Sequence, residues 1–155
     1  MVVGNPRSTA RFAGHPIHPM LVPYPLAFLF GALLTDLAYW QLRTAFWAQA
    51  SFWLIAAGIV GGLAAALAGF TDFFGDRRIR ALSHAWQHML GNLLVVLLSL
   101  FNLFLRLGSA EGGVLPLGLA ISAAVALLLV FTGWRGGDLV YRHRVGIPDA
   151  SGDEI

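Results

Sequence analysis

The side chains of this sequence best suited to hold a metal ion or a haem iron are five histidines: His15, His18, His84, His88 and His143. Imidazole is the commonest nitrogen ligand for zinc, iron and copper. His84 and His88 are four residues apart, so on a helix they share one face and could bind one metal ion together. What the set can bind depends on where the fold places these imidazoles.

The chain that positions these histidines has a composition suited to lipid. Hydrophobic residues make up 57% of its 155 residues and charged residues 12%, against about 25% charged in a typical soluble domain. The chain has no cysteine, which excludes disulfides and thiolate metal sites. Its net charge of +2 is small and dispersed, so we expect a lipid bilayer and no nucleic acid among its partners.

Four apolar stretches are long enough to cross a bilayer, whose core of about 30 Å needs roughly 20 helical residues. They run over residues 21–40, 47–74, 84–107 and 114–134. The short links between them favour antiparallel neighbours. The sequence therefore predicts an all-α fold, an up-down four-transmembrane-helix bundle. One domain covers residues 1–148, with an interfacial C-terminal segment, and a polar tail follows at 149–155.

The arginines predict an orientation for this bundle. We call the end that holds the N-terminus side A and the opposite end side B. Side B has Arg43 and Arg106, and side A has Arg7, Arg11, Arg77, Arg78, Arg80, Arg135, Arg142 and Arg144. Since basic loops stay on the cytoplasmic side, we expect a multi-pass protein of the bacterial inner membrane with both termini in the cytoplasm.

With this threading, every histidine falls at or just beyond side A. His15 and His18 precede the first span, His84 and His88 open the third, and His143 follows the fourth. Asp72, at the side-A end of the second span, adds a carboxylate. All four helices therefore bring a candidate ligand to one corner of the bundle, which predicts a site for haem b or for a zinc, iron or copper ion.

Haem and a bare metal ion are both open at this point. His84 and His88 project from one side of one helix, so they cannot approach a haem iron from opposite faces. A haem would need one of them together with His18 or His143, whereas the spacing of four suits a metal ion. Asp72 would be a metal ligand or would orient an imidazole. Asn92, on the face of His88, would orient an imidazole too.

Other polar positions also have two interpretations. Asp36 lies inside the first span, where a carboxylate is costly. It either pairs with Arg106 or Arg43 or takes part in a proton relay. Asp72 could instead cap a turn or pair with an arginine of the loop that follows it.

Prolines and glycines predict local backbone features. Pro16 and Pro19 predict an extended segment from His15 to His18. Gly136-Gly137 predicts the end of the fourth helix, after which Tyr141 would dip toward the membrane. The repeated small residues of the second span, among them Gly58 and Gly62, indicate close helix packing or room for a flat cofactor.

In chain order, the blocks GHPIHPMLVPYPLAFLFGALLTDL, AGFTDF, HAWQHMLGN and GGDLVYRHRVGI resemble a prokaryotic membrane-protein family catalogued as domain of unknown function 2231. The resemblance covers roughly residues 14–147 and implies a four-helix inner-membrane protein. It carries over these family-pattern positions: His15, His18, Asp36, Asp72, His88, Asn92, Tyr141 and His143. Tyr24-Pro25 departs from the pattern, because a histidine is expected near there.

Such domains also resemble modules found beside redox proteins, which implies electron transfer. We therefore expect a membrane protein that exchanges electrons with quinone or another redox partner, and that could form a homo-oligomer. The alternative is a cofactor-free transporter or a structural subunit of a membrane complex. The chain has four spans and no evident inverted repeat, which speaks against a stand-alone secondary transporter.

Overall fold

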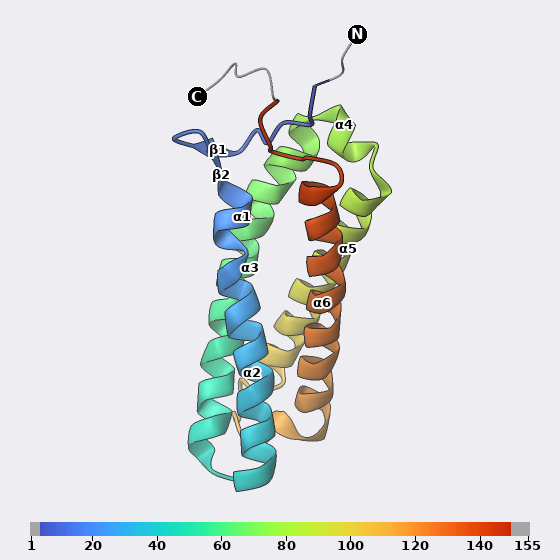
Figure 1. Ribbon diagram of the computed structural model, residues 1–155. Coiled ribbons are helices and arrows are strands. Elements are labelled where there is room, and N and C mark those ends of the chain that lie inside the picture. Colours follow the sequence, from blue (N-terminus) through green and yellow to red (C-terminus); the bar gives the residue numbers. More distant parts are fainter. Residues whose placement is uncertain (1–3, 150–155) are drawn as a thin grey trace.

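The computed structural model describes residues 4–149 and has four long helical spans that lie side by side (Figure 1). The first span consists of α1 (Ile17–Leu21) and α2 (Pro23–Leu42), and the second is α3 (Ala45–Gly75). The third is α5 (Ser83–Phe104), and η1 (Val114–Gly118) continues into α6 (Leu119–Tyr141) as the fourth. All four are long and apolar enough to cross a membrane, which confirms the predicted all-α four-transmembrane-helix fold.

The start of the first span differs from the prediction. A hairpin of β1 (Arg11–Phe12) and β2 (His15–Pro16) comes first, and α1 begins directly after Pro16. His18 is therefore helical, and the predicted extended segment was wrong at this residue. Pro19 lies in the first turn of α1, where backbone N–H groups have no helical partner, so the missing N–H of proline costs nothing.

The helices form two antiparallel pairs around a shared core. α2 packs on α3, α5 packs on α6, and the pairs meet through contacts of α2 with α6 and of α3 with α5. The central core cluster consists of Leu29, Val95, Ile121, Val125 and Leu129. Large apolar side chains also cover the outside, where Leu67 and Leu127 are each 72% exposed. Such a surface fits a lipid surrounding.

The small residues of α3 let neighbouring helices approach closely. A Cβ atom added at Gly58 would come within 2.7 Å of the Leu29 side chain, and one at Gly61 would lie 3.2 Å from Pro25. At Gly62 the nearest atom, on Val96, would be at 3.5 Å. Side chains of the neighbouring helices already use this space, which favours packing over room for a flat cofactor at these positions.

The fourth helix is longer than the sequence predicted. It continues through Gly136-Gly137 and ends at Tyr141, so the predicted helix end at this glycine pair was wrong. The chain then reverses at Arg144 and Gly146, whose φ angles are 54° and 78°. The N–H of Gly146 donates to the carbonyl of Pro6 at 2.9 Å. Both described ends of the chain therefore lie at side A (Figure 1).

Residues 4–10, which we call the N-terminal strap, cross the side-A ends of the helices. Asp72, in the last turn of α3, accepts hydrogen bonds from Ser8 Oγ at 2.9 Å and from the N–H groups of Thr9 and Ala10 at 2.7 and 2.8 Å. Thr9 Oγ1 donates to the same carboxylate oxygen at 3.4 Å. Asp72 therefore fixes the strap to α3.

A second carboxylate, Asp76, connects the strap to α4 (Arg77–Arg80). It accepts from the N–H of Arg7 at 2.9 Å and caps α4 by accepting from the N–H of Arg78 at 2.8 Å. The guanidinium of Arg78 also binds this carboxylate, with the shortest contact at 2.7 Å. These hydrogen bonds, chiefly those from the Arg78 side chain, hold the pKa of Asp76 well below its ordinary value.

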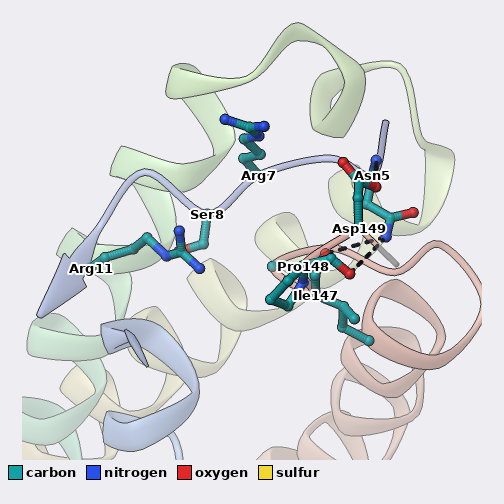
Figure 2. A pocket seen from close by; sticks show the side chains of 8 residues that line it. Asn5, Arg7, Ser8, Arg11, Ile147, Pro148 and Asp149 are labelled. Carbon is teal, nitrogen blue, oxygen red and sulfur yellow. Dashed lines mark hydrogen bonds between the residues drawn. The ribbon is translucent and has the colours of Figure 1, made fainter. Parts of the chain in front are cut away.

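The strap also contacts the C-terminal segment, as Figure 2 shows. The N–H of Asn5 donates to Asp149 Oδ1 at 2.8 Å, and Asn5 Nδ2 donates to the carbonyl of Ile147 at 3.3 Å. The predicted polar tail at 149–155 lies outside the described residues except for Asp149.

Candidate functional site

Two histidines from different helix pairs face each other in the side-A half of the bundle. His18 lies on α1 and His88 on α5. Their ring centroids are 5.8 Å apart and the ring planes meet at 89°. Each residue is partly buried. The pair therefore bridges the two halves of the fold.

Each ring is fixed through Nδ1 to a main-chain carbonyl of a neighbouring helix. His18 Nδ1 lies 2.7 Å from the carbonyl oxygen of Ala65 on α3, and His88 Nδ1 lies 2.8 Å from that of Thr132 on α6. Because a carbonyl only accepts, Nδ1 carries the proton in both hydrogen bonds. In the neutral ring this leaves the lone pair on Nε2, the arrangement typical of metal-binding histidines.

A glycine follows each of these carbonyls by four residues. Gly69 follows Ala65, and a Cβ there would lie 3.0 Å from His18 Nδ1. Gly136 follows Thr132, and a Cβ there would lie 2.9 Å from His88 Cε1. A helical side chain covers the turn on the N-terminal side of its own Cα. The absence of a side chain at each glycine therefore opens the carbonyl one turn earlier to the imidazole.

Asn92 lies one turn deeper than His88 on the same helix. Its Nδ2 donates to the carbonyl of His88 at 2.8 Å and is 3.3 Å from both ring nitrogens. Its Oδ1 accepts from Thr132 Oγ1 at 3.3 Å. Asn92 thus connects the ring, the helix that carries it and the helix that supplies its carbonyl partner.

His84 and His143 form a second pair, nearer to the side-A surface. His143 Nε2 and His84 Nδ1 are 3.3 Å apart, and the ring centroids are 5.1 Å apart. The other nitrogen of His84, Nε2, lies 3.7 Å from Asp138 Oδ2. Asp138 is 7% exposed. Asp138 was not among the predicted site residues, because it follows a glycine pair that was interpreted as the helix end.

The remaining candidates do not join these pairs. His15 is exposed in β2, and its Nδ1 donates to the carbonyl of Ala13 at 2.8 Å. Asp72 is occupied by the strap, and Tyr141 is 84% exposed. No group of three or more His, Asp or Glu side chains within residues 4–149 could hold a metal ion. The structure therefore does not unite the predicted metal ligands: His18, His84, His88, His143 and Asp72.

Asp36 lies in a buried polar network near side B. Arg106 Nη1 and Nη2 donate to its two carboxylate oxygens, each at 2.8 Å, and Ser122 Oγ donates to it at 2.6 Å. Both charged side chains are 0% exposed. Arg106 also donates to Ser51 Oγ at 2.9 Å and to Asn102 Oδ1 at 3.1 and 3.2 Å. All five N–H groups of the guanidinium are thus used.

This network confirms the predicted pairing of Asp36 with Arg106. The prediction counted Arg106 among the side-B arginines that set the orientation, whereas its side chain is buried inside the bundle. Arg43 is exposed, and its Nε donates to the carbonyl of Trp40. The sequence reasoning did not select Ser51, Asn102 and Ser122. Their only signal was that each is a polar residue within an apolar stretch.

Two cavities lie away from both histidine pairs. One, of about 30 Å³, lies between the strap and residues 146–149 (Figure 2). The other, of about 400 Å³, lies at side B, where Phe52, Trp53 and Leu107 are among the residues that line it.

The comparisons with known proteins give one match. A family model described as "Predicted membrane protein (DUF2231)" matches residues 14–149. No curated protein and no solved structure matches the chain.

Proposed function

The chain belongs to the DUF2231 family of predicted membrane proteins, and on that premise we propose that it binds one haem b between His18 and His88 and transfers single electrons. The observation that carries this proposal is the facing imidazole pair. Each Nδ1–H is held by a carbonyl, at 2.7 and 2.8 Å, so Nε2 of each ring would be the atom that holds the haem.

The number of available ligands favours haem over a bare metal ion. A structural zinc site takes four protein ligands, but no group of three or more candidates occurs among residues 4–149. In haem the porphyrin supplies four nitrogens, so the protein adds only axial ligands. His18 and His88 come from opposite helix pairs, so these two imidazoles would hold the haem between the two halves of the bundle. His84 and His88, on one helix, would not.

The residues around the pair fit this role. Gly69 and Gly136 allow the imidazoles to lie directly against α3 and α6. The rings contact each other edge to face, with centroids 5.8 Å apart, so an inserted macrocycle must separate them. Asn92 Nδ2 is the donor near His88 Nε2, at 3.3 Å. Asn92 Nδ2 would keep its shorter hydrogen bond to the His88 carbonyl, at 2.8 Å, when Nε2 of His88 binds the haem.

When bound, haem b supplies one-electron redox chemistry at its iron. His18 and His88 hold the group, and the carbonyl partners fix the direction of each ring. The apolar helices exclude water, and the low dielectric of the bilayer shapes the reduction potential. Quinone dissolved in the bilayer, or a redox protein, is the proposed electron partner. The protein belongs in a lipid bilayer, and a homo-oligomer is a further proposal.

The orientation is also a proposal. Both described ends of the chain lie at side A, and this end carries exposed arginines, among them Arg11, Arg77 and Arg142. Basic segments stay on the cytoplasmic side, so side A faces the cytoplasm of a bacterium and the protein lies in the inner membrane. Reporter fusions at residue 149 test this, and a periplasmic signal would contradict it.

Haem binding tests the function itself. The purified protein in detergent is titrated with haemin, and stoichiometry is read from the Soret band and the pyridine haemochrome. We expect one haem per chain in the wild type and loss of binding in His18→Ala and His88→Ala. The matched control His15→Ala should bind normally, since His15 is exposed and outside the pair. Absence of binding by wild type would leave the cofactor-free transporter or structural subunit.

A further inference from the structure

A second group of titratable side chains lies one helical turn nearer to side A than His88. His143 Nε2 and His84 Nδ1 are 3.3 Å apart, and His84 Nε2 is 3.7 Å from Asp138 Oδ2. The three side chains lie on α5, on α6 and on the chain after α6. Their order, from the partly buried imidazoles to the buried carboxylate, is that of a chain along which a proton can move.

The backbone holds His143 in this position. Its N–H donates to the carbonyl of Asp138 at 3.1 Å, and the N–H of Val145 donates to that of Leu139 at 3.0 Å. These hydrogen bonds close the end of α6 and turn the chain back over the bundle. The contact with His84 is therefore built into the fold.

Asp138 is paired with two arginines and still has one oxygen directed at the cluster. Arg142 Nε donates to Oδ1 at 2.9 Å, and Arg135 Nη1 lies 3.7 Å from Oδ2. The side chain of Asp138 is buried, with 8% of its surface exposed. Within the described residues its Oδ2 nevertheless has no hydrogen-bond partner. The carboxylate thus remains available to attract a positive charge on His84.

Three other charged groups at side A, Arg78, Arg80 and Asp72, bind partners outside this cluster. Arg78 binds Asp76 and the carbonyl of Gly4, and Arg80 Nη1 donates to the carbonyl of Phe74. Asp72 binds the strap. Asp138 is the charged side chain that lies next to the imidazole pair, and Arg135 and Arg142 contact Asp138.

From this geometry we propose that His143, His84 and Asp138 form a proton-uptake chain, in which the two imidazoles share one proton taken from water at side A when an electron enters the site at His18 and His88. The proposal rests on the haem function proposed above. One electron would pass from a quinol in the bilayer to the bound group, and one proton would pass from the aqueous phase at side A to the imidazole pair, so that the proton offsets the charge of the electron.

Two physical arguments support a single shared proton. A second proton on this pair would place two positive charges on rings whose nitrogens are 3.3 Å apart, which like-charge repulsion opposes. A proton also needs no cavity, and neither of the two cavities is lined by His84, His143 or Asp138. The link to His88 is electrostatic, because His84 lies one turn away on the same helix face.

The first measurement needs no haem. The full chain, labelled with ¹⁵N-histidine and held in lipid nanodiscs, is titrated by NMR. We expect the signals of His84 and His143 to change in two coupled steps. His143→Gln should return the titration of His84 to a single step. If that variant folds poorly, Asp138→Asn takes its place, and it should alter the titrations of both His84 and His143. The control His15→Gln should change neither. Independent, single-step titrations of His84 and His143 in the wild type would overturn the shared proton.

The second measurement uses the haem-loaded protein. If one proton is taken up with each electron, the midpoint potential falls by about 59 mV for each unit by which the pH rises. We expect this dependence in wild type and in His15→Gln, and its loss in His143→Gln. A potential independent of pH, with coupled titrations intact, would overturn the link to electron transfer. If no haem binds, the proposed function fails, and the NMR titration still decides whether the proton is shared.

Discussion

Replacing Asp36 by asparagine removes the carboxylate that pairs with Arg106. Nη1 and Nη2 of Arg106 then lose a charged acceptor at 2.8 Å, and the new amide offers one acceptor oxygen where the carboxylate accepts from three donors, the third being Ser122 Oγ at 2.6 Å. Two unit charges about 4 Å apart attract by about 4 kcal/mol at an effective dielectric constant of 20. Breaking a buried ion pair on one side costs about 3–5 kcal/mol. We therefore expect the unfolding free energy of Asp36→Asn to fall by that amount.

The measurement is reversible unfolding by dodecyl sulfate in mixed micelles, followed by far-UV circular dichroism. The double variant Asp36→Asn with Arg106→Gln should be more stable than Asp36→Asn alone, because it leaves no unpaired buried charge. The matched control is Arg43→Gln at the exposed side-B arginine, which should change stability by less than about 0.5 kcal/mol. A loss below about 1 kcal/mol in Asp36→Asn, or strictly additive effects in the double variant, would refute the reasoning.

Three other predictions concern side A. Gly136→Ala places a Cβ 2.9 Å from the His88 ring, so it should cost about 1–3 kcal/mol and weaken haem binding. Gly133→Ala, where the added atom meets open space, should leave both unchanged. Asp72→Ala removes the acceptor for the strap, so limited proteolysis should cut residues 4–10 faster than in wild type; an unchanged rate would argue against this anchoring. Because the pKa of Asp76 lies below its unfolded value of 3.8, Asp76 stabilises the fold above that pH. The stabilisation is lost as pH falls further, so thermal unfolding of Asp76→Asn should show a weaker acid dependence than that of wild type, and equal dependence would contradict it.

The sequence predicted the four spans because hydropathy over some twenty residues is a strong signal in a chain that must satisfy its backbone within lipid. It did not predict the end of the fourth helix. Gly136-Gly137 has the appearance of a helix stop, but within a membrane span a glycine also marks a close approach. Here that approach is made by His88. A helix end and a close contact at a glycine can be told apart only when the neighbouring side chain is known from the structure.

The histidines were predictable as a side-A group but not as separate pairs. Which imidazoles meet depends on the rotation of each helix about its axis, and a change of one residue turns a side chain by about 100°. The sequence placed His143 at side A but did not identify His84 as its partner, because that contact depends on the reversal of the chain after α6. The pairing of Asp36 with Arg106 was predicted, but the burial of Arg106 was not. Arg106 stands at the end of an apolar run, and its burial depends on Asp36 at matching depth.

Low-temperature electron paramagnetic resonance of the oxidised, haem-loaded protein tests the facing imidazole pair most directly. If His18 and His88 are the two axial ligands, wild type gives a low-spin, six-coordinate signal. His18→Ala and His88→Ala, wherever they retain haem, give a high-spin signal that added imidazole returns to low spin. A low-spin signal that survives both substitutions, or a high-spin signal in wild type, would contradict ligation by this pair.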